Sequence, residues 1–222
     1  MTDAALQRLN MVESQIRPSD VTDRRILRAM AEIAREAFVP AELAAFAYMD
    51  EPVPLVAMAK PGDLRRSLMA PRTFAKLIQL AQIEPSDRVL IAGAGRGYSA
   101  AVISHLAREV VALEADEAFA GGAKAALAGF ANVVVETGAL IQGAPSRPPF
   151  DVIVIDGTVW EPPAMLLARL KDGGRLVGVL AADGVAHAAL WQRVGDHFAH
   201  TAAFEAAAGP LPGFARTPTF VL

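Results

Sequence analysis

The stretch VLIAGAGRGYSAAVI, residues 89–103, decides the fold. Its apolar run is typical of a buried strand, and three glycines, Gly93, Gly95 and Gly97, form a turn before a helix-forming segment. Glycines let the backbone of such a turn approach a ligand closely, and the start of the helix adds a partial positive charge. The stretch therefore predicts the ligand-binding edge of an α/β sheet.

The spacing of these glycines indicates which ligand the turn holds. A dinucleotide fingerprint, G-x-G-x-x-G, needs its third glycine at the place where Tyr98 stands. The observed pattern is Gly-x-Gly-x-Gly, with Ala94 between the first two glycines, and it favours the amino-acid end of S-adenosylmethionine over NAD. The alternative is a turn that only makes a tight connection.

Two carboxylates close predicted strands at the same edge of the sheet. Glu114 ends the second strand, 19 positions after Gly95, where a carboxylate accepts hydrogen bonds from both hydroxyls of a ribose. Asp156 ends the fourth strand in VIVIDG, where it either lines the ligand pocket or caps the following loop. For Glu114 the alternative is a solvated surface side chain.

Strand and helix patterns alternate from residue 71 onward, which predicts a mostly parallel sheet with helices on both faces. The predicted strands span 88–92, 110–114, 132–136, 150–156 and 175–180. The predicted helices span 71–83, 98–107, 116–130 and 162–170. Two further strands, 187–194 and 197–205, flank the tight turn Gly195-Asp196 and predict an antiparallel hairpin at the edge of the sheet.

Residues 1–70 differ from the rest and are predicted to form a helical N-terminal extension with a substrate-side loop. A first helix runs until Pro18, and Thr22 is expected to cap a second helix that ends near Pro40. The segment 50–71 contains four prolines and little periodicity, so we expect a long connection. Residues 71–222 are then one compact Rossmann-like domain.

Composition limits the possible functions. The 222 residues are 53% hydrophobic and carry a net charge of -3, which describes a globular protein with little general attraction to nucleic acid. The absence of cysteine excludes disulfides and zinc-thiolate sites. His197 and His200 lack a nearby third ligand, so no metal site is expected. Without a signal peptide or an apolar run long enough for a membrane helix, we expect a cytoplasmic protein with no membrane partner.

Three segments carry a resemblance to a known family. MVESQIRPSDVTDRRILRAMAEIAREAFVP, AYMDEPVPL and DRVLIAGAGRGYSAAVIS resemble protein-L-isoaspartate O-methyltransferases, and NVVVETG, PFDVIVIDG and LKDGGRLVGVL continue the similarity in register. The resemblance implies a seven-stranded, Rossmann-like class I methyltransferase fold. It also implies S-adenosylmethionine as cofactor, S-adenosylhomocysteine as product, and damaged proteins with isoaspartyl carboxylates as partners in protein repair.

The resemblance, together with the turn, also gives a set of expected site residues. The residues expected to bind the cofactor are Gly93, Ala94, Gly95, Gly97, Tyr98, Glu114, Ala115, Gly138, Ala139 and Asp156. The residues expected to bind the substrate are Arg65, Arg66, Leu68, Arg72 and Trp160.

The chain departs from the family pattern at several polar positions. Anchored on Pro71, the family's active-site serine falls on Met69, which has no hydroxyl, and its threonine falls on Ser67; these two positions are the catalytic candidates. The acid of the first strand falls on Ala92, and an aspartate after the third strand falls near Gly138. Three polar contacts implied by the resemblance are therefore missing.

The implied reaction tolerates such losses, because a carboxylate is already an anionic nucleophile at neutral pH and needs no base. Positioning alone supplies about 7–11 kcal/mol in well-oriented reactions, and one lost hydrogen-bond donor costs on the order of 10²–10³ in rate. Repair methylation is thus the first hypothesis. A methyltransferase with another acceptor, or a non-catalytic binding homologue, are the alternatives.

Overall fold

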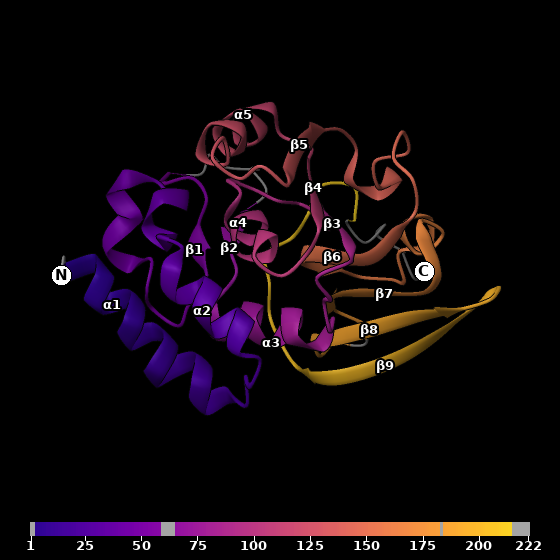
Figure 1. Cartoon of the computed structure of the whole chain (residues 1–222), viewed down its shortest axis with the longest axis horizontal. Coiled ribbons are helices and arrows are strands. Elements are labelled where there is room, and N and C mark those ends of the chain that lie inside the picture. Colours follow the sequence, from indigo (N-terminus) through magenta and orange to yellow (C-terminus); the bar gives the residue numbers. More distant parts are fainter. Residues whose placement is uncertain (1–2, 59–64, 183, 215–222) are drawn as a thin grey trace, which may run out of the picture.

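A seven-stranded sheet forms the centre of the computed structural model, which describes residues 3–58, 65–182 and 184–214 (Figure 1). The strands lie in the order β5-β4-β3-β6-β7-β8-β9. Their bounds are β3 Arg88–Ala92, β4 Glu109–Glu114, β5 Val133–Thr137, β6 Phe150–Val159, β7 Leu170–Leu180, β8 His187–Val194 and β9 His197–Glu205. The predicted fold class is confirmed, with β6 and β7 longer than the sequence pattern indicated.

The five strands β5, β4, β3, β6 and β7 run parallel. The apolar runs of β3, β4 and β6 are mostly buried, as is typical of a parallel sheet covered on both faces, whereas the edge strand β5 is partly exposed. In β3 every residue after Arg88 is buried. Ala92, the last residue of β3, pairs with Leu113 on one side and with Ile155 on the other. The carboxyl ends of β3, β4 and β6 therefore meet at one edge, where the glycine turn begins.

The last two strands form the expected antiparallel hairpin. β8 pairs with β7, and β9 pairs with β8 from His187↔Glu205 to Val194↔His197. β9 is the outer strand and is almost entirely exposed, with Phe204 as its half-buried exception. The long hairpin projects from the body of the molecule at the lower right of Figure 1.

Helices cover both faces of the sheet. α3 Pro71–Leu80 and α4 Tyr98–Ser104 pack into a large core cluster with the N-terminal helices, whereas α6 Ala164–Leu167 packs into a second cluster on the other face. α5 Glu117–Ala126 lies beside β4 and β5. The helix expected over 162–170 has only four residues, because the chain already enters β7 at Leu170.

The N-terminal extension is helical, as expected. α1 Asp3–Met11 continues as a π-helical turn, Val12–Ile16, and then as a 3₁₀ turn, Arg17–Ser19. α2 Arg24–Glu32 follows. The cap of α2 is Asp23, whose carboxylate accepts from the Arg25 backbone N–H at 2.8 Å, so the prediction that Thr22 caps this helix is wrong.

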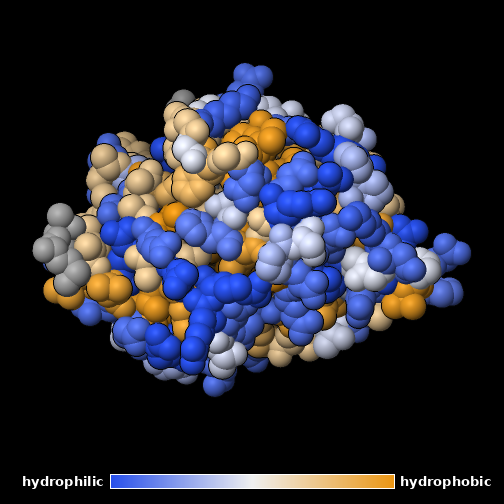
Figure 2. Space-filling view, viewed as in Figure 1, coloured by the Kyte–Doolittle hydropathy of each residue, from blue (hydrophilic) through white to orange (hydrophobic). Residues whose placement is uncertain are grey.

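The helix also ends earlier than predicted. α2 ends at Glu32, and a short 3₁₀ segment, Arg35–Phe38, replaces the last part of the helix expected to end near Pro40. A second 3₁₀ segment, Ala41–Phe46, follows Pro40. Hydrophilic residues cover much of the face drawn in Figure 2, interrupted by small apolar patches. Within the described part of the chain, no helix is long and apolar enough to cross a membrane.

The segment 50–71 is not a plain connection. Its two ends pair as a small antiparallel hairpin, β1 Val53–Pro54 with β2 Ser67–Leu68, and the Leu55 N–H donates to the Arg66 carbonyl at 3.0 Å. Residues 59–64 of the expected loop lie outside the described residues. This hairpin lies between the N-terminal helices and the sheet edge (Figure 1), and it brings Arg66 to the glycine turn.

Candidate active site

The glycine turn adopts the backbone conformation that its composition predicts. Gly93, Gly95 and Gly97 have φ angles of 90°, 56° and 101°, a region that side chains strain to enter. A Cβ on Gly95 would lie 2.8 Å from a methyl carbon of Leu55, and one on Gly97 would lie 2.8 Å from a methyl carbon of Leu127. The positive φ angles at this turn therefore favour glycine, and an added Cβ would also displace the leucine methyl groups.

Glu114 ties the end of β4 to this turn. Its side chain is fully buried, and its Oε2 accepts from the Gly95 N–H at 2.7 Å. Its Oε1 accepts from the N–H groups of Ala115 and Asp116 at 2.8 and 3.0 Å. The carboxylate is thus held at the place where the sequence predicts a ribose-binding acid.

Arg66 occupies both oxygens of that carboxylate. Its Nη1 donates to Glu114 Oε1 at 3.0 Å, and its Nη2 donates to Glu114 Oε2 at 2.9 Å and to the Gly93 carbonyl at 3.1 Å. The Arg66 side chain is 6% exposed, and its guanidinium lies 5.5 Å from the ring centroid of Phe119. The structure therefore places Arg66, expected to bind the substrate, against Glu114, the acid expected to bind the ribose.

Two leucines close over the turn from either side. Leu55 contacts Gly95, and Leu211 lies against both Gly93 and Gly157. Leu211 reaches this place because the chain after β9 returns to the sheet edge, where the Thr158 N–H donates to the Gly209 carbonyl at 2.9 Å. In this conformation the glycine turn is covered by the protein's own side chains.

A buried polar cluster lies beside the turn. Arg35 is completely buried, donates to the carbonyls of Ala47 and Met69, and stacks over the ring of Tyr98 at 4.8 Å. Four buried side-chain atoms of this cluster have no hydrogen-bond partner within the described ranges. They are Arg35 Nη1, Tyr98 OH, Ser99 Oγ and Asp156 Oδ1.

Asp156 is the carboxylic acid of this cluster, and its protonation state matters most for the chemistry of the site. Burial raises the pKa of its carboxyl to about 6. The Ser99 hydroxyl and the guanidinium groups of Arg66 and Arg35 act in the opposite direction and keep the pKa from rising further, while the Glu114 carboxylate adds to the rise.

The structure describes all three positions at which a polar residue of the family pattern is missing. Met69 is 2% exposed and packs in the core cluster that contains α3 and α4, so its thioether does not face solvent. Ala92 is fully buried in the second cluster. Gly138 follows β5, and its N–H donates to the Glu114 main-chain carbonyl at 2.9 Å, with Ala139 next to it.

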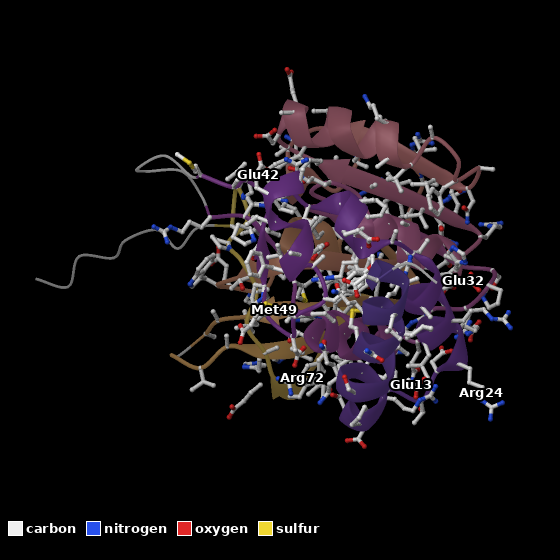
Figure 3. All side chains as sticks on the ribbon, turned by 90° about the vertical axis from the view of Figure 1, so that its left-hand side faces the viewer. Glu13, Arg24, Glu32, Glu42, Met49 and Arg72 are labelled. Atoms are coloured by element: carbon white, nitrogen blue, oxygen red, sulfur yellow. The ribbon has the colours of Figure 1, made fainter. Side chains whose placement is uncertain are left out.

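The remaining substrate-side residues lie around the β1–β2 hairpin and the ends of the strands. Ser67 is half-buried and close to Gly209, Leu68 is buried, and Arg65 is exposed. Arg72, labelled in Figure 3, is exposed and forms an ion pair with Asp50 at 3.2 Å.

A groove of about 800 Å³ runs past the start of α3. Its wall includes Ala70, next to Met69, together with Arg72 and Lys76 on one side and Glu205 on the other. Trp160 follows the end of β6, is half-buried, and does not line this groove.

These residues supply the donor and acceptor set that an adenosyl sulfonium compound needs. The turn offers backbone approach, Glu114 offers two carboxylate oxygens, and Asp156 offers an oxygen without a partner among the described residues. The set fits the cofactor once Arg66 releases Glu114 and the Leu55 and Leu211 side chains move off the turn. The fold and the site together define a class I, S-adenosylmethionine-dependent methyltransferase.

Comparison with known proteins gives the family. The family model described as Protein-L-isoaspartate(D-aspartate) O-methyltransferase matches residues 7–201. The Protein-L-isoaspartate O-methyltransferase of Koribacter versatilis is 37% identical over 179 residues, which cover 80% of this chain and 78% of the relative. That of Methylorubrum populi is 39% identical, and the match covers 80% of both chains. The chain belongs to the protein-L-isoaspartate O-methyltransferase family.

Solved structures agree with this assignment. A Protein-L-isoaspartate O-methyltransferase superposes with a TM-score of 0.80 at 25% identity, over 93% of this chain and 66% of that one. A putative enzyme of the same name from Plasmodium falciparum, in complex with S-adenosyl-L-homocysteine, has the same fold, with a TM-score of 0.73 at 16% identity. That match covers 90% of this chain and 96% of the other.

Some residues of the site were absent from the sequence-based set. Arg35 and Leu211 gave no signal, because an arginine in a helix-like segment and a leucine near a proline are ordinary in any sequence. Leu55 lay in the segment expected to be a loop. Only the packing of distant segments against the glycine turn identifies these residues.

Proposed function

We propose that this chain transfers a methyl group from S-adenosylmethionine to the isoaspartyl carboxylate of damaged protein chains. The observation that carries the proposal is the link between the glycine turn and Glu114, which meet through the 2.7 Å hydrogen bond from the Gly95 N–H. Family membership over residues 7–201 supports the same activity. The proposed partners are proteins or peptides with isoaspartyl residues, and the proposed compartment is the cytoplasm.

Each part of the turn then has a role. Gly93, Ala94, Gly95 and Gly97 bring the backbone close to the cofactor, and Tyr98 packs behind the turn. Glu114 accepts hydrogen bonds from the hydroxyls of the ribose, and the Ala115 N–H fixes its Oε1 by donating to it. Gly138 and Ala139 are the further positions expected to bind the cofactor. When bound, the cofactor supplies a methyl group activated by the positive sulfur.

The ion pair sets a condition for this role. Both oxygens of Glu114 already accept from Arg66 and from backbone N–H groups. A ribose diol and the Arg66 guanidinium therefore compete for the same acceptors. Arg66 must leave Glu114 for the cofactor to bind, and its side chain then becomes available to the acceptor side.

The acceptor side works by orientation rather than by proton removal. Arginine side chains pair well with carboxylates, so Arg65, Arg66 and Arg72 are suited to hold an anionic acceptor near Ser67. The groove of about 800 Å³ beside Ala70 and Arg72 is the proposed place for the peptide acceptor. Leu68 and Trp160 supply apolar contacts. We also propose that residues 1–70 form a helical extension on the substrate side and that residues 71–222 form the methyltransferase domain.

Other observations favour two alternative functions. Met69 is buried and brings no hydroxyl to the site, which favours a methyltransferase with a different acceptor. Ala92 and Gly138 lack the expected carboxylates, and Arg66 already satisfies Glu114, which favours a binding protein without catalysis.

One pair of measurements separates these functions. Radiolabelled methyl transfer is measured to a peptide with one isoaspartyl residue and to the same peptide with aspartate. Transfer to the first peptide alone supports repair methylation. Calorimetric binding of S-adenosylhomocysteine without transfer to either peptide indicates another acceptor. Absence of both binding and transfer overturns the proposed function and supports the non-catalytic homologue.

A further inference from the structure

The chain lacks the acid that its family places at the end of the first parallel strand. That position is Ala92, which is buried and uncharged. In the sheet, Ala92 pairs with Ile155 of the adjacent strand β6. The next residue of β6 is Asp156, so a carboxylate lies one strand away from the vacant position, at the same edge and beside Gly93.

The Asp156 carboxylate has a feature that packing alone does not explain. Its Oδ1 is buried and has no donor in good hydrogen-bond geometry among the described residues; the nearby Ser99 hydroxyl lowers the pKa of this carboxyl and itself lacks a well-aligned partner. Buried carboxylate oxygens are normally satisfied, because desolvation without a partner costs free energy. The nearby Arg35 directs its Nε and Nη2 to the carbonyls of Ala47 and Met69 instead. Because these two hydrogen bonds go to backbone carbonyls, neutralising the charge of Arg35 does not explain the position of this carboxylate oxygen.

We propose that Asp156 binds the ammonium group of the cofactor's amino-acid end and so replaces the acid missing at Ala92. This inference rests on the proposed function, because it assumes a cofactor at the glycine turn. Asp156 is a binding and positioning residue here: it holds the amino-acid end while Glu114 holds the ribose. The Gly93 carbonyl, which now accepts from Arg66, lies at the same edge as a second acceptor.

Several charged and titratable groups face Asp156 from the surrounding elements. They are Ser99 of α4, Arg35 of the Arg35–Phe38 segment, Arg66 beside β2, and Glu114 of β4, and Arg35 in turn stacks over Tyr98. When Arg66 leaves with the arrival of the cofactor, Asp156 loses a nearby cation. A bound ammonium restores that positive charge, which keeps the exchange close to electrically neutral.

The test is calorimetric binding to the full chain, with two ligands that differ only in the amino-acid end. S-adenosylhomocysteine carries the ammonium, whereas 5′-methylthioadenosine has the same nucleoside without it. We expect Asp156→Asn to weaken S-adenosylhomocysteine binding on the order of 10- to 100-fold and to leave methylthioadenosine binding unchanged. Asp196→Asn, at the exposed β8–β9 turn, is the matched control and should bind both ligands normally.

A second variant tests replacement directly. Adding Ala92→Asp to Asp156→Asn returns the acid to the family position and should recover most of the lost affinity. The affinity of the unaltered chain should also fall as the pH drops below about 6, and this dependence should disappear in Asp156→Asn.

The outcomes separate the two proposals. Equal binding of S-adenosylhomocysteine by Asp156→Asn and the unaltered chain refutes the inference and leaves the proposed function standing. An equal loss for both ligands also refutes it, since the residue would then act on the nucleoside pocket as a whole. If the unaltered chain binds neither ligand, the proposed function fails and the inference fails with it.

Discussion

Replacing Arg66 with methionine should reveal how the buried ion pair divides its effect between stability and binding. Methionine keeps much of the side-chain length and removes the guanidinium, so Glu114 loses two hydrogen bonds and Gly93 loses one. Removing one partner of a buried ion pair typically destabilises a protein by about 3–5 kcal/mol. Glu114 keeps three backbone N–H donors, so we expect the lower end, about 3 kcal/mol.

Thermal and urea unfolding measure this change. For a chain of this size, about 3 kcal/mol corresponds to a decrease in Tm of roughly 6–12 °C. Arg65→Met is the matched control: Arg65 is the exposed neighbour, and its replacement should change the free energy of unfolding by less than about 0.5 kcal/mol.

Binding should change in the opposite direction. Without Arg66, the ribose hydroxyls meet a carboxylate that lacks a competitor, so Arg66→Met should bind S-adenosylhomocysteine more tightly than the unaltered chain. At a ligand concentration about 100 times Kd, binding adds about 2.7 kcal/mol of stability, which should nearly close the gap in Tm. Weaker binding by Arg66→Met, or an unchanged Tm without ligand, would show that Arg66 does not compete for Glu114.

Three further predictions concern single positions. Gly97→Ala should lower the free energy of unfolding by about 1–3 kcal/mol, because φ is 101° and Leu127 lies 2.8 Å from the added carbon; urea denaturation checks it, and an unchanged midpoint contradicts it. Asp156→Asn should stabilise the chain at pH 7 by up to about 3 kcal/mol, because the folded pKa of about 6 exceeds the ordinary 3.8. Protonated Asp156 stabilises the fold below pH 3.8, and this contribution is lost as the pH rises through about 6. Comparing unfolding of Asp156→Asn at pH 4 and pH 7 tests the sign, which fails if the advantage is larger at pH 4. Met69→Ser should destabilise the chain by about 2–4 kcal/mol, because Met69 is buried; calorimetry measures this, and a neutral result would mean that the side chain is not packed.

The sheet was predictable because its signals are local. Each parallel strand contains a continuous apolar run, and the runs of β3, β4 and β6 are closed or followed by a glycine or an acidic residue at the same edge. The β8–β9 hairpin followed from Gly195-Asp196 between two alternating segments. Glu114 was recognisable from its distance to Gly95 along the chain.

Other features depend on contacts that no local pattern encodes. Arg66 and Glu114 are 48 residues apart, and nothing in either segment indicates that they meet. The β1–β2 hairpin has two residues in each strand, too few for a strand pattern. Thr22 and Asp23 are both good capping residues, and only the backbone conformation at Asp23 decides between them.

The short strand β2 also has a consequence for how this enzyme diverges. Arg66, proposed to compete with the nucleoside for Glu114, and Ser67, proposed to border the acceptor, are consecutive residues. Ser67 pairs with Pro54 of β1, and the Arg66 carbonyl accepts from the Leu55 N–H. A substitution that reshapes acceptor preference therefore shifts the neighbouring guanidinium as well. Evolution or engineering at this hairpin is therefore expected to change both specificities together. A variant selected for a new acceptor should also be tested for its affinity for the methyl donor.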